Sequence, residues 1–203
     1  PATFFLTSKE AVLFPDLVRR IDAQGEVALS ADEDRVLKKS PAEVQAQRLE
    51  TALRDLQPFV SNPIVGLAPP GSFYDVGTAR AMRQAGLRYL LLPGTGESAA
   101  PRVLDWYRDA DFRETLLADA DAGTPNAAER RTAQGDRLFA LPATGRDDYT
   151  VLTLLGTAGE PAAQLAAYRD DFNRIHRAQG LYVLPFHAEL QGLTAERAGV
   201  LAG

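Results

Sequence analysis

Short apolar segments alternate with helical patterns along almost the whole chain, and this alternation constrains the fold most. Strands are expected at Ala2–Leu6, Glu26–Leu29, Ile64–Leu67, Arg88–Leu92, Leu138–Leu141, Tyr149–Leu155 and Leu181–Phe186. Helices are expected between them, with clear starts at the capping box Ser40-Pro41-Ala42-Glu43, at Asp75 and at Pro161. Because strands that alternate with helices pair in parallel, the pattern predicts an α/β fold with a mostly parallel sheet.

Composition limits the classes of protein that fit this pattern. The 203 residues suffice for one domain, and no repeat or linker divides them, so we expect a single domain over residues 1–203. A net charge of −5 gives no basic surface for nucleic acid, and the apolar runs are too short for a membrane span. The sequence has no cysteine and two histidines, His176 and His187, so few side chains could bind a transition metal. Because cysteine is absent, the redox compartment is not determined by the sequence.

Three consecutive acidic residues, Asp32, Glu33 and Asp34, follow the strand at Glu26–Leu29. The carboxyl ends of parallel strands carry the chemistry of most α/β enzymes, so this cluster is a candidate functional site. Its oxygens would suit Mg²⁺ or Ca²⁺. A solvated loop or first helical turn explains the acids equally well, and we favour that interpretation.

Other polar and aromatic residues allow a structural and a functional interpretation. The loop Ala68-Pro69-Pro70-Gly71 is either the wall of a sugar-binding groove or a rigid turn. Trp106 either stacks on a sugar ring or, as we favour, packs in the core, and Asp147-Asp148-Tyr149 is interpreted as a turn. No G-x-S-x-G, P-loop or G-x-G-x-x-G motif supports a serine hydrolase, an NTPase or a dinucleotide-binding protein.

The order of these pieces resembles the NodB-homology polysaccharide deacetylases, carbohydrate esterase family 4. The resemblance rests on Ala2-Thr3-Phe4-Phe5, on Pro15–Ile21 (P-x-L-V-x-R-I), on Gly66–Gly71 (G-F-R-P-P-x-G), on Gln84–Leu90 and on Val183–His187. It implies a (β/α) barrel, which we expect to be distorted and incomplete because the family's T-F-D-D-G strand is not in this sequence. The chain begins at Pro1, and we expect it to be a fragment of a longer chain.

The chain departs from the family at the metal ligands that the resemblance implies. The family holds zinc or another divalent metal through an aspartate of T-F-D-D-G and two histidines spaced H-x-x-x-H. Those histidines align with Ser30 and Asp34, the arginine of the third motif aligns with Ala68, and only the late histidine has a counterpart, His187. A hydroxyl and one carboxylate do not supply three-point coordination. We therefore expect no metal and no cofactor, and expect these four residues to converge as a vacated site.

The resemblance implies a catalytically silent deacetylase-like domain that binds glycans or acts as a scaffold in bacterial envelope polysaccharide metabolism. It would then lie in the periplasm or at the cell surface, with polysaccharides or envelope proteins as partners. The candidate substrate contacts are Pro69, Pro70, Tyr74, Trp106 and His187. Two alternatives stay open: an active hydrolase of amide or ester bonds on N-acetylated sugars, with its catalytic aspartates upstream, and an interaction module whose groove is filled by side chains.

Overall fold

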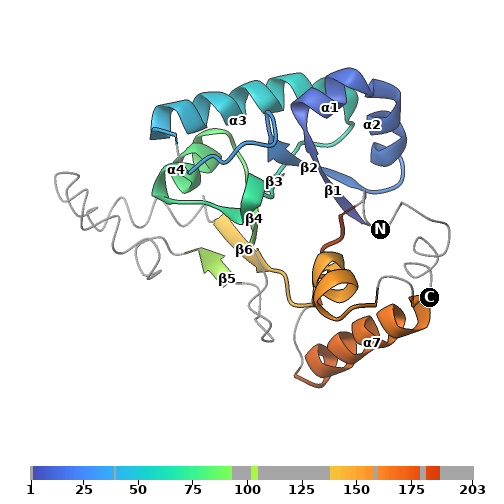
Figure 1. Cartoon of the computed structure of the whole chain (residues 1–203). Coiled ribbons are helices and arrows are strands. Elements are labelled where there is room, and N and C mark those ends of the chain that lie inside the picture. Colours follow the sequence, from blue (N-terminus) through green and yellow to red (C-terminus); the bar gives the residue numbers. More distant parts are fainter. Residues whose placement is uncertain are drawn as a thin grey trace. The chain divides into compact units, whose positions relative to one another are not determined.

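The structure is a computed structural model that describes residues 2–38, 40–92, 102–104, 138–157, 160–178 and 182–187 (Figure 1). Its strands are β1 (Thr3–Thr7), β2 (Glu26–Ala31), β3 (Gly66–Leu67), β4 (Tyr89–Leu92), β5 (Arg102–Leu104) and β6 (Leu138–Pro142). Its helices are α1 (Ser8–Leu13), α2 (Pro15–Asp22), α3 (Ala42–Leu56), α4 (Val76–Gln84) and α7 (Pro161–Arg177). Shorter helical segments are η1 (Gln57–Phe59), η2 (Pro70–Ser72) and the π-helical η3 (Thr150–Leu154).

The described residues group into two compact units. The first runs to Leu91 and includes Arg102–Ala140, and the second contains Leu92 and the chain from Leu141 onward. The predicted functional residues are divided between them, so each unit is described by itself.

The strands form one mixed sheet in the order β1-β2-β3-β4-β6-β5. The pairs β1–β2, β2–β3 and β3–β4 are parallel, whereas β5 and β6 are antiparallel. Among the described strands β1 and β5 are the edges, so the sheet is open. This arrangement confirms the predicted α/β fold with a mostly parallel sheet.

The core of the first unit lies where helices cover the sheet. Leu29, Leu67 and Leu90, on neighbouring strands, are 0%, 0% and 1% exposed. Helix α3 contacts both β2 and α4 (Figure 1), and it contributes the fully buried Leu49 and Leu56. Burial of leucine side chains of this kind stabilises a fold by about 1.5–3 kcal/mol each relative to exposure, so this contact fixes α3 on the sheet.

The start of α3 differs from the prediction. The expected capping box at Ser40 is wrong, because the helix begins at Ala42 and its N-cap residue, Pro41, offers no side-chain hydrogen bond. Capping boxes form instead at two other helices, between Thr7 and Glu10 of α1 and between Asp75 and Thr78 of α4. The cap at Asp75 was expected from the sequence, whereas α1 was not.

Two predicted strands are also wrong. Tyr149–Leu155 is helical, because the Asp147 carboxylate accepts the Thr150 N–H (2.8 Å) and so caps a helical turn. Within Leu181–Phe186, the described residues from Tyr182 onward have no regular secondary structure. That segment is nevertheless bonded to a loop, since the Val183 carbonyl accepts the Thr144 N–H (2.9 Å).

A tyrosine clamp joins strands near the amino end of the sheet. The Tyr89 hydroxyl donates to Glu26 Oε1 (2.9 Å), and Glu26 Oε2 accepts the Thr3 hydroxyl (2.7 Å). The ring crosses β3 at Gly66, where an added Cβ would lie 2.2 Å from the Tyr89 Cζ. Burial, followed by the Glu26 carboxylate, raises the pKa of Tyr89 well above its usual range. Gly66 is therefore required for the clamp.

Gly66→Ala is expected to displace the Tyr89 ring, break its bond to Glu26 and destabilise the chain by about 1–3 kcal/mol. Because the native pKa is raised, the wild-type clamp stabilises the fold below pH 10.0 and is lost as pH rises above that value. Denaturant unfolding between pH 8 and 11 should show this loss in the wild type and less of it in the variant. Tyr89→Phe is the control that removes the bond without the clash, and a Gly66→Ala variant with wild-type stability would contradict the clamp.

Candidate functional site

The carboxyl end of β2 has an irregular backbone. Leu6 pairs with Leu29 and Thr7 with Ala31, so Ser30 forms a bulge between them. The next residue, Ala31, is fully buried and has a φ of 125°, a conformation that L-residues rarely adopt. Bulges and strained residues collect at functional sites, and here they lie at Ser30 and Ala31, where the sequence predicted part of a vacated site.

Asp32, the first residue of the acidic cluster, is held on both sides. Its carboxylate pairs with Arg48 of α3, with Oδ1 2.6 Å from Nη2 and 2.8 Å from Nε. Its carbonyl accepts the Lys9 N–H (3.2 Å) and the Ser8 hydroxyl (3.4 Å) at the start of α1. Asp32 is therefore part of the framework, in contrast to the favoured interpretation of a solvated acid.

Glu33 and Asp34 agree better with that interpretation. Glu33 makes an exposed ion pair with Arg35 (3.4 Å), and Asp34 is exposed. Exposed pairs of this kind contribute little to stability. These two acids lie on the surface of the loop.

The residues present at this strand end do not fit a transition-metal site. Ser30 offers a hydroxyl, Asp34 is exposed, and the Asp32 carboxylate is taken by Arg48. In the described ranges no group of three or more His, Cys, Asp or Glu side chains is placed to hold a metal ion. A catalytic zinc site takes three nitrogen, sulfur or carboxylate ligands from the protein and leaves one position open, and this set does not supply three such ligands.

The loop after β3 lies beside the same strand end. The Ala68 N–H donates to the Leu29 carbonyl (2.9 Å), which places Ala68 next to the Ser30 bulge. Pro69 and Pro70 are buried, and Tyr74 is half-buried. The burial of both prolines favours the rigid turn over a sugar-binding wall.

A histidine–aspartate pair lies in the second unit. His187 Nδ1 is 2.6 Å from Asp148 Oδ1, and the His187 N–H donates to Asp148 Oδ2 (2.8 Å). The Asp148 side chain is fully buried, whereas that of His187 is 46% exposed. The buried carboxylate thus fixes both the backbone and the ring of an accessible imidazole. Sequence reasoning identified His187 but interpreted Asp148 as part of a turn.

The predicted convergence of Ser30, Asp34, Ala68 and His187 involves residues of both units. Ser30 and Ala68 lie at neighbouring strand ends, with Asp34 a few residues further along the chain, and all three are in the first unit. His187 is in the second unit, so its convergence with them stays a prediction. Trp106 lies outside the described residues, and His176 is exposed on α7, where it stacks on Phe172 (5.7 Å between ring centroids).

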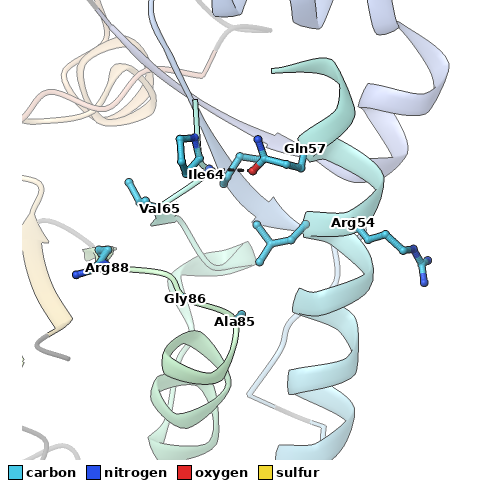
Figure 2. Close-up of a pocket in the computed structure, with 9 residues that line it drawn as sticks. Arg54, Gln57, Ile64, Val65, Ala85, Gly86 and Arg88 are labelled. Carbon is cyan, nitrogen blue, oxygen red and sulfur yellow. Dashed lines mark hydrogen bonds between the residues drawn. The ribbon is translucent and has the colours of Figure 1, made fainter. Parts of the chain in front are cut away.

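A groove of about 450 Å³ lies at the amino ends of β3 and β4, at the other end of these strands from the Ser30 bulge (Figure 2). It is lined by residues that end α3 and α4 and precede β3 and β4: Leu53, Arg54, Gln57, Pro63, Ile64, Val65, Ala85, Gly86 and Arg88. Figure 2 shows Arg54 pointing away from the other labelled residues, and the Gln57 Oε1 accepts the Ile64 N–H (3.2 Å). Its polar groups do not converge, so we do not take this groove as the site.

Comparisons with known proteins agree with the fold. The sequence model of the polysaccharide deacetylase family matches residues 1–90, and no curated protein matches the sequence. A protein from Mycobacterium smegmatis assigned as a polysaccharide deacetylase has a TM-score of 0.72 at 20% identity, over 99% of this chain and 63% of that one. A protein from Pseudomonas aeruginosa with the same assignment has a TM-score of 0.71 at 15% identity, over 99% and 59%.

The fold is also shared with an enzyme of a different named activity. An allantoinase (PuuE) has a TM-score of 0.68 at 16% identity, over 99% of this chain and 59% of that one. The chain therefore has the fold of the polysaccharide deacetylase structures and spans about three fifths of their length. None of the helices among the described residues combines the length and the hydropathy of a membrane span.

The loop that supports the His187 segment depends on a second buried acid. The Asp171 side chain is 4% exposed. Its Oδ2 accepts two hydrogen bonds from Arg146, one from the side-chain Nε–H (2.9 Å) and one from the backbone N–H (2.8 Å). Burial alone would raise the pKa of Asp171, but the hydrogen bonds from Arg146 and Arg174 outweigh it and lower the pKa. The carboxylate is thus stabilised in its charged form.

Asp171→Asn is expected to destabilise the second unit by about 1.5–3 kcal/mol at neutral pH. Because the native pKa is lowered, this stabilisation is present above the ordinary pKa of 3.8 and is lost as pH falls through the native value. Urea unfolding between pH 2 and 7 should show that slope in the wild type and lack it in the variant. Asp170→Asn, at a neighbouring side chain that is 72% exposed, is the matched control. Equal losses in the two variants would contradict the assignment.

Proposed function

We propose that this chain is a polysaccharide deacetylase-like protein without a catalytic metal, which binds glycans or acts as a scaffold and does not hydrolyse them. The family model over residues 1–90 and the shared fold support the class. The absence of catalysis is our inference from the residues at the end of β2.

One observation carries this proposal, the state of the Asp32 carboxylate. It is the least exposed acid of the loop, and it is bound to a guanidinium rather than directed at a ligand. The neighbouring Ser30 is a poor metal ligand, and Asp34 alone cannot fix a metal. A reaction that requires a metal to polarise an amide carbonyl and activate water has no support from these groups.

The glycan-binding role rests on the family resemblance and on two candidate contact positions in the segment after β3. Tyr74 is half-buried in the segment between β3 and α4, and Ala68 is partly exposed at the position that the resemblance aligns with an arginine. We propose N-acetylated polysaccharides as the ligand class, and the periplasm or the cell surface as the location.

A second candidate function is an active hydrolase of amide or ester bonds on N-acetylated sugars. The observation that favours it is the pair of Asp148 and His187, because a buried carboxylate that orients an accessible imidazole is suited to general acid–base catalysis. In this alternative, the catalytic aspartates belong to a segment upstream of Pro1.

The two candidates differ in turnover. N-acetylated oligosaccharides incubated with the full-length protein are expected to release no acetate above background, and calorimetry is expected to detect binding. Release of acetate that chelators abolish would establish the hydrolase instead. Neither binding nor turnover would leave the interaction module as the function and overturn the glycan-binding proposal.

The metal content tests the site independently of the glycan. We expect the purified chain to contain no stoichiometric zinc, cobalt or nickel by elemental analysis. The double variant Ser30→His with Asp34→His restores the family spacing and is expected to bind Zn²⁺ more tightly than the wild type does in a calorimetric titration. One tightly held transition metal per wild-type chain would overturn the proposal, and no gain in the double variant would contradict the alignment.

A further inference from the structure

Helix α3 contributes one cation to the loop that follows β2. This loop, Asp32–Leu37, is called the β2 loop below. Arg48 lies in the middle part of α3, and its guanidinium reaches three oxygens of the loop: Asp32 Oδ1 (2.6 Å), the Arg35 carbonyl (2.9 Å) and the Val36 carbonyl (3.3 Å). These three oxygens of the loop are thus gathered around the Arg48 guanidinium.

These oxygens are the kind that a hard cation takes in proteins. Calcium sites combine carboxylates with backbone carbonyls, and the ion holds the loop that supplies them. In the β2 loop a planar guanidinium binds that set of oxygens: Nε and Nη2 contact the Asp32 carboxylate, Nη2 also donates to the Arg35 carbonyl, and Nη1 donates to the Val36 carbonyl. Arginine suits this task because its fork of donors is rigid and always charged.

The Asp32–Arg48 pair is more buried than the neighbouring pair of Glu33 and Arg35. The Arg48 side chain is 11% exposed and that of Asp32 is 26% exposed, whereas those of Arg35 and Glu33 are 74% and 42% exposed. A partner removed from a largely buried pair leaves a charge that water cannot fully solvate. The Asp32–Arg48 pair therefore holds the loop more firmly than the exposed pair next to it does.

The position of Arg48 is itself fixed by the helix. The adjacent Leu49 is fully buried, and Gln45, about one turn earlier, donates to Asp75 Oδ1 (3.2 Å) and accepts the Thr78 hydroxyl (2.6 Å) from α4. Helix α3 is therefore held by packing and by hydrogen bonds next to the turn that carries the arginine. The guanidinium is thus delivered to the loop by a rigid element.

We propose that Arg48 is the internal cation that orders the β2 loop, so that this loop keeps its conformation without a divalent metal. The proposal goes beyond the proposed function, since it concerns the order of the loop and not the ligand that the protein binds. It assigns a positioning role to a residue that no motif or spacing in the sequence singles out.

Limited trypsin digestion reads this order directly, because Arg35 and Lys38 are cleavage sites within or next to the loop. In Arg48→Met we expect cleavage at these two sites to accelerate about tenfold or more, with the fragments identified by mass spectrometry. A fall in melting temperature of about 5–10 °C should accompany it, as expected when a buried pair is broken. Arg54→Met is the matched control on the same helix, because Arg54 is 72% exposed and pairs with its neighbour Asp55.

Two further variants keep the test decisive if Arg48→Met fails to fold. Arg48→Lys keeps the charge but not the fork, and Asp32→Asn removes the carboxylate charge at nearly constant shape, so both should show intermediate rates. The wild type should be cleaved equally fast with and without EDTA, Mg²⁺ or Ca²⁺. Wild-type rates in the variants that fold, or protection of the wild type that depends on divalent cations, would overturn the proposal. Neither result depends on glycan binding or turnover.

Discussion

The packing of α3 against β2 and α4 is the constraint on which the rest of the first unit depends. Leu49 and Leu56 are buried on one face of this helix, and Leu29 is buried in the strand that it contacts. That apolar contact sets the height of α3 along the sheet, and so decides which helical residue lies level with the end of β2. The residue in that place is Arg48, and the conformation of the loop follows from its charge.

Much of the architecture was predictable because local patterns of apolar and helix-capping residues determine it. The alternation of apolar strands with helices predicted a parallel α/β sheet, and Asp75 predicted the start of α4. The failures have physical causes as well. Ser40 matched a capping box, but the helix begins after Pro41. The apolar run at Tyr149–Leu155 fits a strand or a short helix equally well, and the carboxylate of Asp147 decided between them.

The site was less predictable than the fold, because its contacts join residues far apart in the chain. Nothing in the sequence pairs Arg48 with Asp32 or Asp148 with His187, since both pairs arise only once the elements have packed. The fold does not select a chemistry either, as structures assigned as polysaccharide deacetylases and an allantoinase share it. Evidence for function has to come from such pairs rather than from the order of the strands.

The two contacts between Asp148 and His187 have a consequence for ligand binding. One buried carboxylate accepts the backbone N–H of His187 and contacts the ring nitrogen of the same residue, so the imidazole is oriented before any ligand arrives. Most surface side chains lose rotational freedom when they bind, at a cost of about 0.5–1.5 kcal/mol each. For His187 part of that rotational entropy is already lost when the chain folds. A molecule that contacts this ring meets a preorganised donor or acceptor, and its affinity reflects the contact itself.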